Sequence, residues 1–184
     1  MGCRPFAACT VDGAPARLWS CDTPWDWAGL LVHLSRNDHR ELSVRMLANA
    51  FVDIPRHEQP RVVLEWVQEN VRYEPDDPPA RLRAWLAAMQ AGKPGDPFER
   101  FSGPGRTIGR GAGDCDDSSR VVRAVLRCLG HNARLVFIGD RNGPHHVTAA
   151  IPTPSGQWFW LDASLPARAG EHPNRAKERL DGLH

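Results

Sequence analysis

One cysteine, two adjacent histidines and one aspartate have the residue types of a nucleophile, a base and a group that orients the base. They occur along the chain in that order, as Cys115, His145 and His146, and Asp162. A nucleophilic cysteine needs a lowered pKa, a base within hydrogen-bond reach and a partner that holds the base. These residues are therefore candidates for covalent acyl-transfer chemistry.

Carboxylates flank Cys115 on both sides, although negative neighbours oppose a thiolate. The residues Asp114, Asp116 and Asp117 surround the cysteine just before an apolar pattern that predicts a helix over 118–129. Unpaired N–H groups and the dipole at a helix start favour a negative sulfur, and aspartates are good N-cap residues. We expect a depressed pKa for Cys115, with the acids turned toward backbone N–H groups. For this string alone, a capped helix start with an incidental cysteine is the simpler interpretation.

The segments HHVTAAIP and QWFWLDAS, joined by TPSG, predict a β-hairpin that brings a histidine beside Asp162. A three-residue Thr-Pro-Ser loop followed by Gly156 as the bulge glycine places His146 directly opposite Asp162. A two-residue loop would align His145 instead, but it requires a positive φ at Thr153, which is costly for a β-branched residue. A four-residue loop also aligns His145, so this alternative stays open.

Helical patterns come first along the chain and strand patterns come last, which predicts an α+β protein. We expect one domain over 1–184. It comprises an irregular extension over 1–37 with Trp19, Trp25 and Trp27 as packing anchors, a core over 38–165 and a polar, frayed tail over 166–184. Helices are expected at 38–49, 57–71, 80–92 and 118–129, a long loop at 93–113, and strands at 133–140, 145–152 and 157–164. In the first helix, Leu42, Val44, Met46 and Leu47 are expected to face inward.

Composition narrows the classes of partner and the cellular location. The formal net charge is +1, so no general field attracts nucleic acid or an anionic membrane, and no apolar stretch reaches membrane-spanning length. The five cysteines include no CxxC pair, which predicts reduced thiols in a cytoplasmic protein. A metal-only function would use His131, His145 and His146, whose spacing matches no zinc pattern. The cysteines are Cys3, Cys9, Cys21, Cys115 and Cys128.

Three strings together resemble the transglutaminase-like superfamily of papain-like cysteine enzymes, over roughly residues 40–165. They are LEWVQENVRY, then GAGDCDDSSRVVRAVLRCLGHNARLVFIG, then HHVTAAIPTPSGQWFWLDAS. The resemblance implies a fold in which the cysteine-bearing helix packs on an antiparallel sheet. It implies Cys115 as the nucleophile, His146 as general base and acid, and Asp162 as the orienting group. It also makes Tyr73 a candidate for the oxyanion hole, together with the Cys115 N–H.

The same resemblance implies a cysteine-dependent acyl-transfer enzyme that acts on peptide or protein amides through a thioester. With water as acceptor it is a peptidase or amidase, which we favour; with an amine it is a cross-linking transglutaminase. A catalytically idle binding or assembly module of phage origin is the further alternative. The GDCDD form is most similar to phage and bacterial transglutaminase-like cysteine proteinases, which implies a cytoplasmic protein with virion association as a second location.

Calcium is the one cofactor that this likeness suggests. Some of the similar proteinases hold calcium through acids that flank the cysteine, so Asp114 and Asp116 are candidate ligands, with helix capping as their favoured role. No cofactor is expected to be required. The chain departs from the family at Val147 and Thr148, where an aromatic residue often follows the histidine.

Overall fold

The computed structural model describes residues 2–11, 14–21, 23–75 and 102–182. Its helical segments are α1 (Pro24–Leu34), the 3-10 helix η1 (Ser35–Arg40), α2 (Leu42–Asn49), α3 (Gln59–Asn70), α5 (Pro104–Arg110), α6 (Cys115–Cys128) and α7 (Pro173–Asp181). Its strands are β1 (Arg4–Val11), β2 (Ala14–Ser20), β3 (Arg72–Tyr73), β4 (Ala112–Gly113), β5 (Arg134–Asp140), β6 (Gly143–Pro152) and β7 (Trp158–Leu161).

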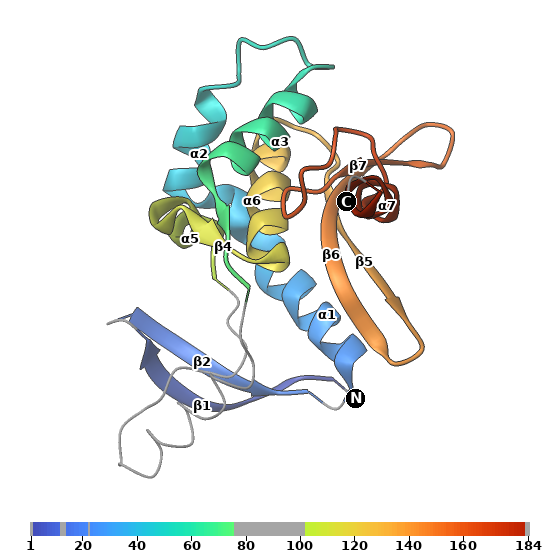
Figure 1. The fold of residues 1–184 in the computed structure, drawn as a ribbon. Helices are drawn as coiled ribbons and strands as arrows, with labels where there is room; N and C mark the ends of the chain where they lie inside the picture. The colour runs from blue at the N-terminus through green and yellow to red at the C-terminus, as the bar shows by residue number, and fades with distance from the viewer. Residues whose placement is uncertain (1, 12–13, 22, 76–101, 183–184) are drawn as a thin grey trace.

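Helix α6 runs through the middle of the fold, between a group of helices and a small sheet (Figure 1). The sheet is antiparallel with strand order β5-β6-β7, and the helices α2 and α3 lie on the other side of α6. Helices that precede and cover an antiparallel sheet form an α+β fold, as the sequence predicts.

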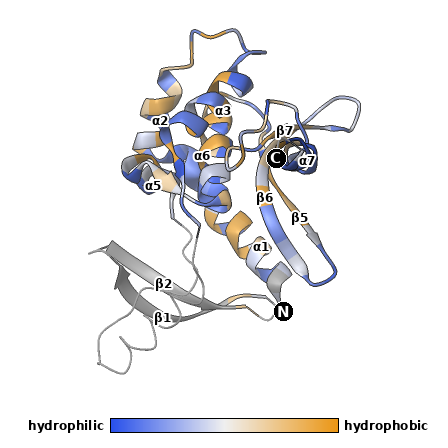
Figure 2. Cartoon of the chain, viewed as in Figure 1, coloured by the Kyte–Doolittle hydropathy of each residue, from blue (hydrophilic) through white to orange (hydrophobic). Residues whose placement is uncertain are grey.

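The core forms around α6 because its apolar residues recur at helical spacing. Val121, Val122, Val125 and Leu126 are fully buried, and they belong to one cluster with residues of α2, α3 and the sheet. Apolar segments in Figure 2 recur along α1, α3 and α6, whereas α7 is hydrophilic. The helix begins at Cys115, three residues before the predicted start, because Asp114 provides the N-cap.

The N-terminal 37 residues are not irregular, contrary to the prediction. The strands β1 and β2 pair antiparallel as a separate two-stranded sheet, and α1 follows. A capping box between Thr23 and Asp26 starts α1, with a proline in its first turn. Trp25 is 44% exposed, so it is not the packing anchor that we expected.

The prediction of uniformly reduced thiols is also wrong. Cys3 and Cys21 form a disulfide that joins the two ends of the β1–β2 hairpin, while Cys115 and Cys128 are free. Sequence spacing did not reveal this pair because its two members come together only when the hairpin forms.

The predicted helix over 38–49 is two segments with a break at Glu41, which has extended backbone angles. Because the helix starts again after this break, the inward face of α2 carries Val44 and Ala48, which are buried. Leu42 and Met46 were expected inside but are 72% and 66% exposed.

Two other segments differ from their predictions. The loop predicted over 93–113 forms α5 and β4 in its described part. Its first residues lie outside the described residues, as does the helix predicted over 80–92. The tail forms α7 rather than fraying, because Arg179 donates to the Glu171 carboxylate at 3.0 and 3.1 Å and to the Pro166 carbonyl at 2.9 Å.

Candidate active site

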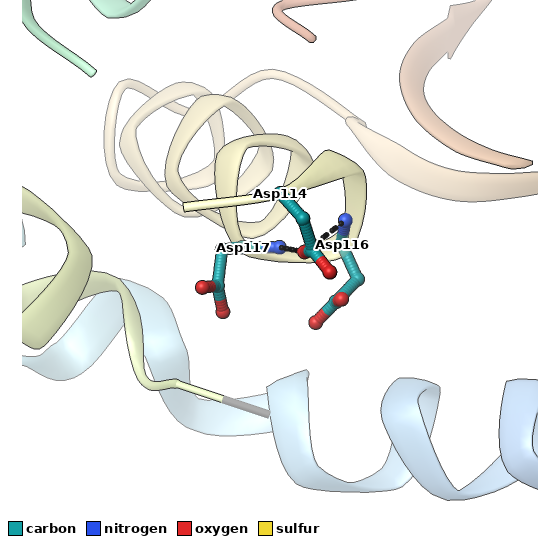
Figure 3. A group of neighbouring side chains, drawn as sticks. All are labelled: Asp114, Asp116 and Asp117. Carbon is teal, nitrogen blue, oxygen red and sulfur yellow. Dashed lines mark hydrogen bonds between the residues drawn. The ribbon is translucent and has the colours of Figure 1, made fainter. Parts of the chain in front are cut away.

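The loop into α6 places Cys115 at the first residue of the helix. The Oδ1 atom of Asp114 accepts hydrogen bonds from the N–H groups of Asp116 at 3.2 Å and Asp117 at 3.4 Å (Figure 3). Asp117 in turn accepts a hydrogen bond from the Ser102 N–H at 3.0 Å. Asp114 therefore caps the helix start, as the sequence predicts, whereas Asp117 accepts its hydrogen bond from a residue outside the helix.

Cys115 nevertheless does not have the depressed pKa that we expected. Burial of the thiol, followed by the negative charges of Asp114 and Asp116, raises the pKa of Cys115 to about 12. A hydrogen bond from the backbone of Val147 works in the opposite direction. The dipole argument underestimated the cost of removing a thiolate from water beside two carboxylates.

A buried ion pair between Asp38 and Arg120 fixes the helix that carries Cys115. The guanidinium of Arg120 donates to both carboxylate oxygens of Asp38 at 2.9 Å, and to the Ser102 carbonyl at 2.7 Å. Burial alone would lower the pKa of Arg120, but the hydrogen bonds and charge of Asp38 raise it. The first turns of α6 are thereby joined to η1 and to the chain that enters α5.

The hairpin that carries the histidine has a register two positions away from the predicted one. Thr153 N–H donates to the Gln157 carbonyl at 2.8 Å, and Gly156, with φ of +78°, closes the turn. The loop is three residues long, as expected, but it begins one residue later and includes Gly156, which was predicted to follow the loop. Pro152 has no N–H with which to pair across the loop, whereas Thr153 has one.

The shifted register keeps His146 on the same face as Asp162, because a shift of two positions preserves the alternation of side chains. The last pair between β6 and β7 is Ala149 with Leu161, so Asp162 lies across from Thr148 rather than His146. The His146 ring still reaches it diagonally, with Nε2 2.6 Å from the Asp162 Oδ2. His145 points to the opposite face and is exposed.

The Asp162 carboxylate is fully buried and fully supplied with donors. Its Oδ1 accepts from the Ser164 N–H at 3.1 Å and from the Ser164 hydroxyl at 2.7 Å, while Oδ2 faces His146. An ionised carboxylate only accepts, so the Nε2 atom of His146 carries the proton of this bond. The lone pair of neutral His146 is then on Nδ1, the nitrogen that a base needs.

Gln68 of α3 holds the chain that follows β7. Its Nε2 atom lies within hydrogen-bond distance of three carbonyl oxygens, 3.1 Å from Asp162, 2.8 Å from Leu165 and 2.9 Å from Ala167. Sequence reasoning did not find Gln68 or Ser164, since neither residue type identifies such a role without the fold.

Tyr73 is brought to the cysteine by a short parallel pair of strands. It lies beside Gly113, two residues before Cys115, and the next N–H donates from Glu74 to the Gly113 carbonyl at 3.0 Å. The Tyr73 side chain is 50% exposed. Partial burial first, then the charges of Cys115 and Asp114, raise the pKa of Tyr73, so its hydroxyl keeps the proton that a hydrogen-bond donor needs.

The acids beside Cys115 are also the one cluster of potential metal ligands in the part of the chain that the structure describes. Asp114, Asp116 and Asp117 each offer an oxygen within 4.8 Å of the others. Oxygen donors suit calcium, which takes six to eight of them. The three residues would supply part of such a set, and Asp114 and Asp117 already accept backbone hydrogen bonds. Calcium binding by Asp114 and Asp116 therefore stays a prediction.

These features describe an α+β protein with a cysteine at the start of a central helix and a histidine–aspartate pair on the adjoining sheet. The family model described as the transglutaminase-like superfamily matches residues 41–163, which is 123 of the 184 residues. The chain therefore belongs to the transglutaminase-like superfamily. A search of curated proteins finds no significant match. Within the described ranges, no helix combines the length and apolar character needed to cross a membrane.

Proposed function

We propose that the protein is a cysteine-dependent acyl-transfer enzyme that hydrolyses amide bonds of peptides or proteins. The observation that carries this proposal is the 2.6 Å contact between His146 Nε2 and the buried Asp162 carboxylate. The backbone of the next residue, Val147, lies near the Cys115 thiol and lowers its pKa, against the larger effect of burial. Such a pair orients the imidazole and stabilises its protonated form, which is what a nucleophile's base requires.

The raised pKa of Cys115 favours direct proton transfer over a preformed ion pair. A thiol with a pKa of about 12 is essentially un-ionised at neutral pH. In the first step, Cys115 Sγ would bond to the amide carbonyl carbon while its proton passes to Nδ1 of His146. The carbonyl π electrons move to the oxygen, and the charge that develops on His146 is stabilised by Asp162.

In the second step the tetrahedral intermediate collapses. His146 gives its proton to the leaving nitrogen, the C–N bond breaks, and an acyl thioester on Cys115 remains. Water then attacks the thioester carbon, passes a proton to His146, and the C–S bond breaks with return of the proton to Cys115. An amine acceptor in place of water would make the same centre a cross-linking transferase.

The proposed mechanism needs donors that stabilise the developing oxyanion. We assign this role to the Cys115 backbone N–H at the start of α6 and to the protonated Tyr73 hydroxyl. The parallel pairing of Tyr73 with Gly113 supports the second assignment.

The experiment is acid-quench mass spectrometry of the protein mixed with peptide amides, combined with mapping of cleaved peptide ends. We expect an acyl adduct on Cys115 and product release, and loss of both in Cys115→Ala. The matched control is Cys128→Ala, which deletes the second free thiol among the described side chains, one that is exposed at the far end of α6. Equal turnover in Cys115→Ala and the parent would exclude the proposal.

The high pKa of Cys115 also favours a second candidate function, a non-catalytic module used for binding or assembly. A thiol that no base activates would react with iodoacetamide about tenfold faster for each rise of one pH unit, without a plateau near neutrality. A neutral-pH plateau that disappears in His146→Ala would favour the enzyme instead.

A further inference from the structure

Val147, the residue after His146, lies where the β6 strand loses its partner on one side. The last pair of the β6–β7 ladder is Ala149 with Leu161, so β7 ends before it reaches Val147. Among the described strands, Val147 pairs with Phe137 of β5 alone. Within a strand the N–H and C=O of one residue point to the same side. The Val147 side chain is buried, and buried backbone groups need partners.

Helix α6 supplies those partners in place of a strand. The Ser119 hydroxyl, on a fully buried residue, donates to the Val147 carbonyl at 3.0 Å. One helical turn earlier, the backbone of the same residue lies near the Cys115 thiol and lowers its pKa, against the larger effect of burial. Residues four apart share one face of a helix, so Cys115 and Ser119 both face the backbone of Val147, and Ser119 bonds to it directly.

The direction of the Ser119 bond is informative. A serine inside a helix commonly donates to the carbonyl four residues earlier, which here belongs to Cys115. Ser119 instead bonds across to the strand that carries His146. Its hydroxyl therefore ties the helix of the nucleophile to the strand of the base.

We propose that Ser119 is a positioning residue for the nucleophile: by holding the Val147 carbonyl it fixes the edge of β6 against α6, and so sets the distance between Cys115 and His146. This inference rests on the proposed function of Cys115. It adds to the site a residue that touches none of the reacting atoms.

The test is the pH profile of Cys115 alkylation by iodoacetamide, read by peptide mass spectrometry at Cys115. In Ser119→Ala the strand edge is released and the Val147 backbone is no longer held near the sulfur, so the profile should move up by about one pH unit. The alkylation rate at pH 7.5 should then fall about tenfold. A Ser119→Thr variant keeps the hydroxyl and should recover most of the parent profile.

Ser118→Ala is the matched control, since it removes the same atom from the neighbouring buried serine of α6. Thermal unfolding of each variant shows whether it is folded under the assay conditions. If Ser119→Ala does not fold, Ser119→Val replaces it, because valine matches the shape of threonine in Ser119→Thr but has no hydroxyl. Superimposable profiles for the parent and a folded Ser119→Ala would overturn the inference, as would an equal shift in Ser118→Ala. The measurement needs no substrate, so its failure is separate from a failure of the turnover test on Cys115→Ala.

Discussion

The imidazole of His146 contacts the carboxylate of Asp162 at 2.6 Å although the two residues are not opposite each other in the sheet. The contact is diagonal, from a strand residue to one that lies just beyond the end of the neighbouring strand. The contact forms although the observed hairpin register differs by two positions from the predicted one, because both residues remain on one face of the sheet.

Loss of this contact should abolish base function while leaving the fold intact. We expect His146→Ala to lower kcat by a factor on the order of 10³, because the base itself is removed. We expect Asp162→Asn to lower kcat by a factor on the order of 10²–10⁴, because the imidazole loses its tautomer and orientation. The exposed neighbour is the control, and His145→Ala should keep most activity. Greater loss in His145→Ala than in His146→Ala would show that the assignment of the base is wrong.

The high pKa of Cys115 predicts a pH dependence of stability. The pKa rises from 9.0 for a free thiol to about 12 in the fold, so the unfolded chain releases this proton first as the pH rises. The contribution to stability is complete below pH 9.0 and is lost between pH 9.0 and about 12. The parent should lose about 1 kcal/mol of unfolding free energy between pH 9 and 10 relative to Cys115→Ala.

Urea unfolding of the two proteins at several alkaline pH values measures this difference. Cys128→Ala removes an exposed thiol and should leave the slope of the parent unchanged. Parallel stability curves for the parent and Cys115→Ala would contradict the raised pKa.

The buried pair of Asp38 and Arg120 should matter for stability far more than an exposed pair does. In Asp38→Asn the guanidinium remains buried without its countercharge, which costs about 3–5 kcal/mol. The exposed pair of Arg61 and Glu65, at 2.8 Å, is the comparison, and Glu65→Gln should cost far less stability than Asp38→Asn. Chemical denaturation measures the free energy of unfolding of both variants. Equal losses of stability would show that burial does not make the Asp38–Arg120 pair more important than the exposed pair.

The capping role of Asp114 predicts a graded series of variants. Asp114→Ala leaves the N–H groups of Asp116 and Asp117 without their acceptor and should cost about 1 kcal/mol, whereas Asp114→Ser should retain most of the stability. Thermal unfolding measures the series. An Asp114→Ala protein as stable as the parent would show that the cap contributes nothing.

Calcium binding at the same acids has a separate signature. If Asp114 and Asp116 hold calcium, the melting temperature of the parent rises with added calcium and falls in a chelator, and Asp116→Asn loses this response. Ser164→Ala is a control that leaves these carboxylates in place. A melting temperature that does not respond to calcium would leave helix capping as the role of Asp114.

The amino-acid sequence by itself determined the elements that carry the site. The apolar stripe of Val121, Val122, Val125 and Leu126 specifies α6, and alternating residues specify the β6–β7 hairpin, since both patterns follow from local periodicity. Motif spacing also indicated the superfamily to which the chain belongs.

Only the tertiary structure decided how those elements meet. Hairpin register depends on which backbone N–H groups can pair, and the missing N–H of Pro152 moved the loop by one residue. The ionisation of Cys115 depends on how much water the surrounding elements exclude, which no local pattern reports. The contacts of Ser119 and Gln68 join segments 28 and more than 90 residues apart, so they exist only once the chain has folded.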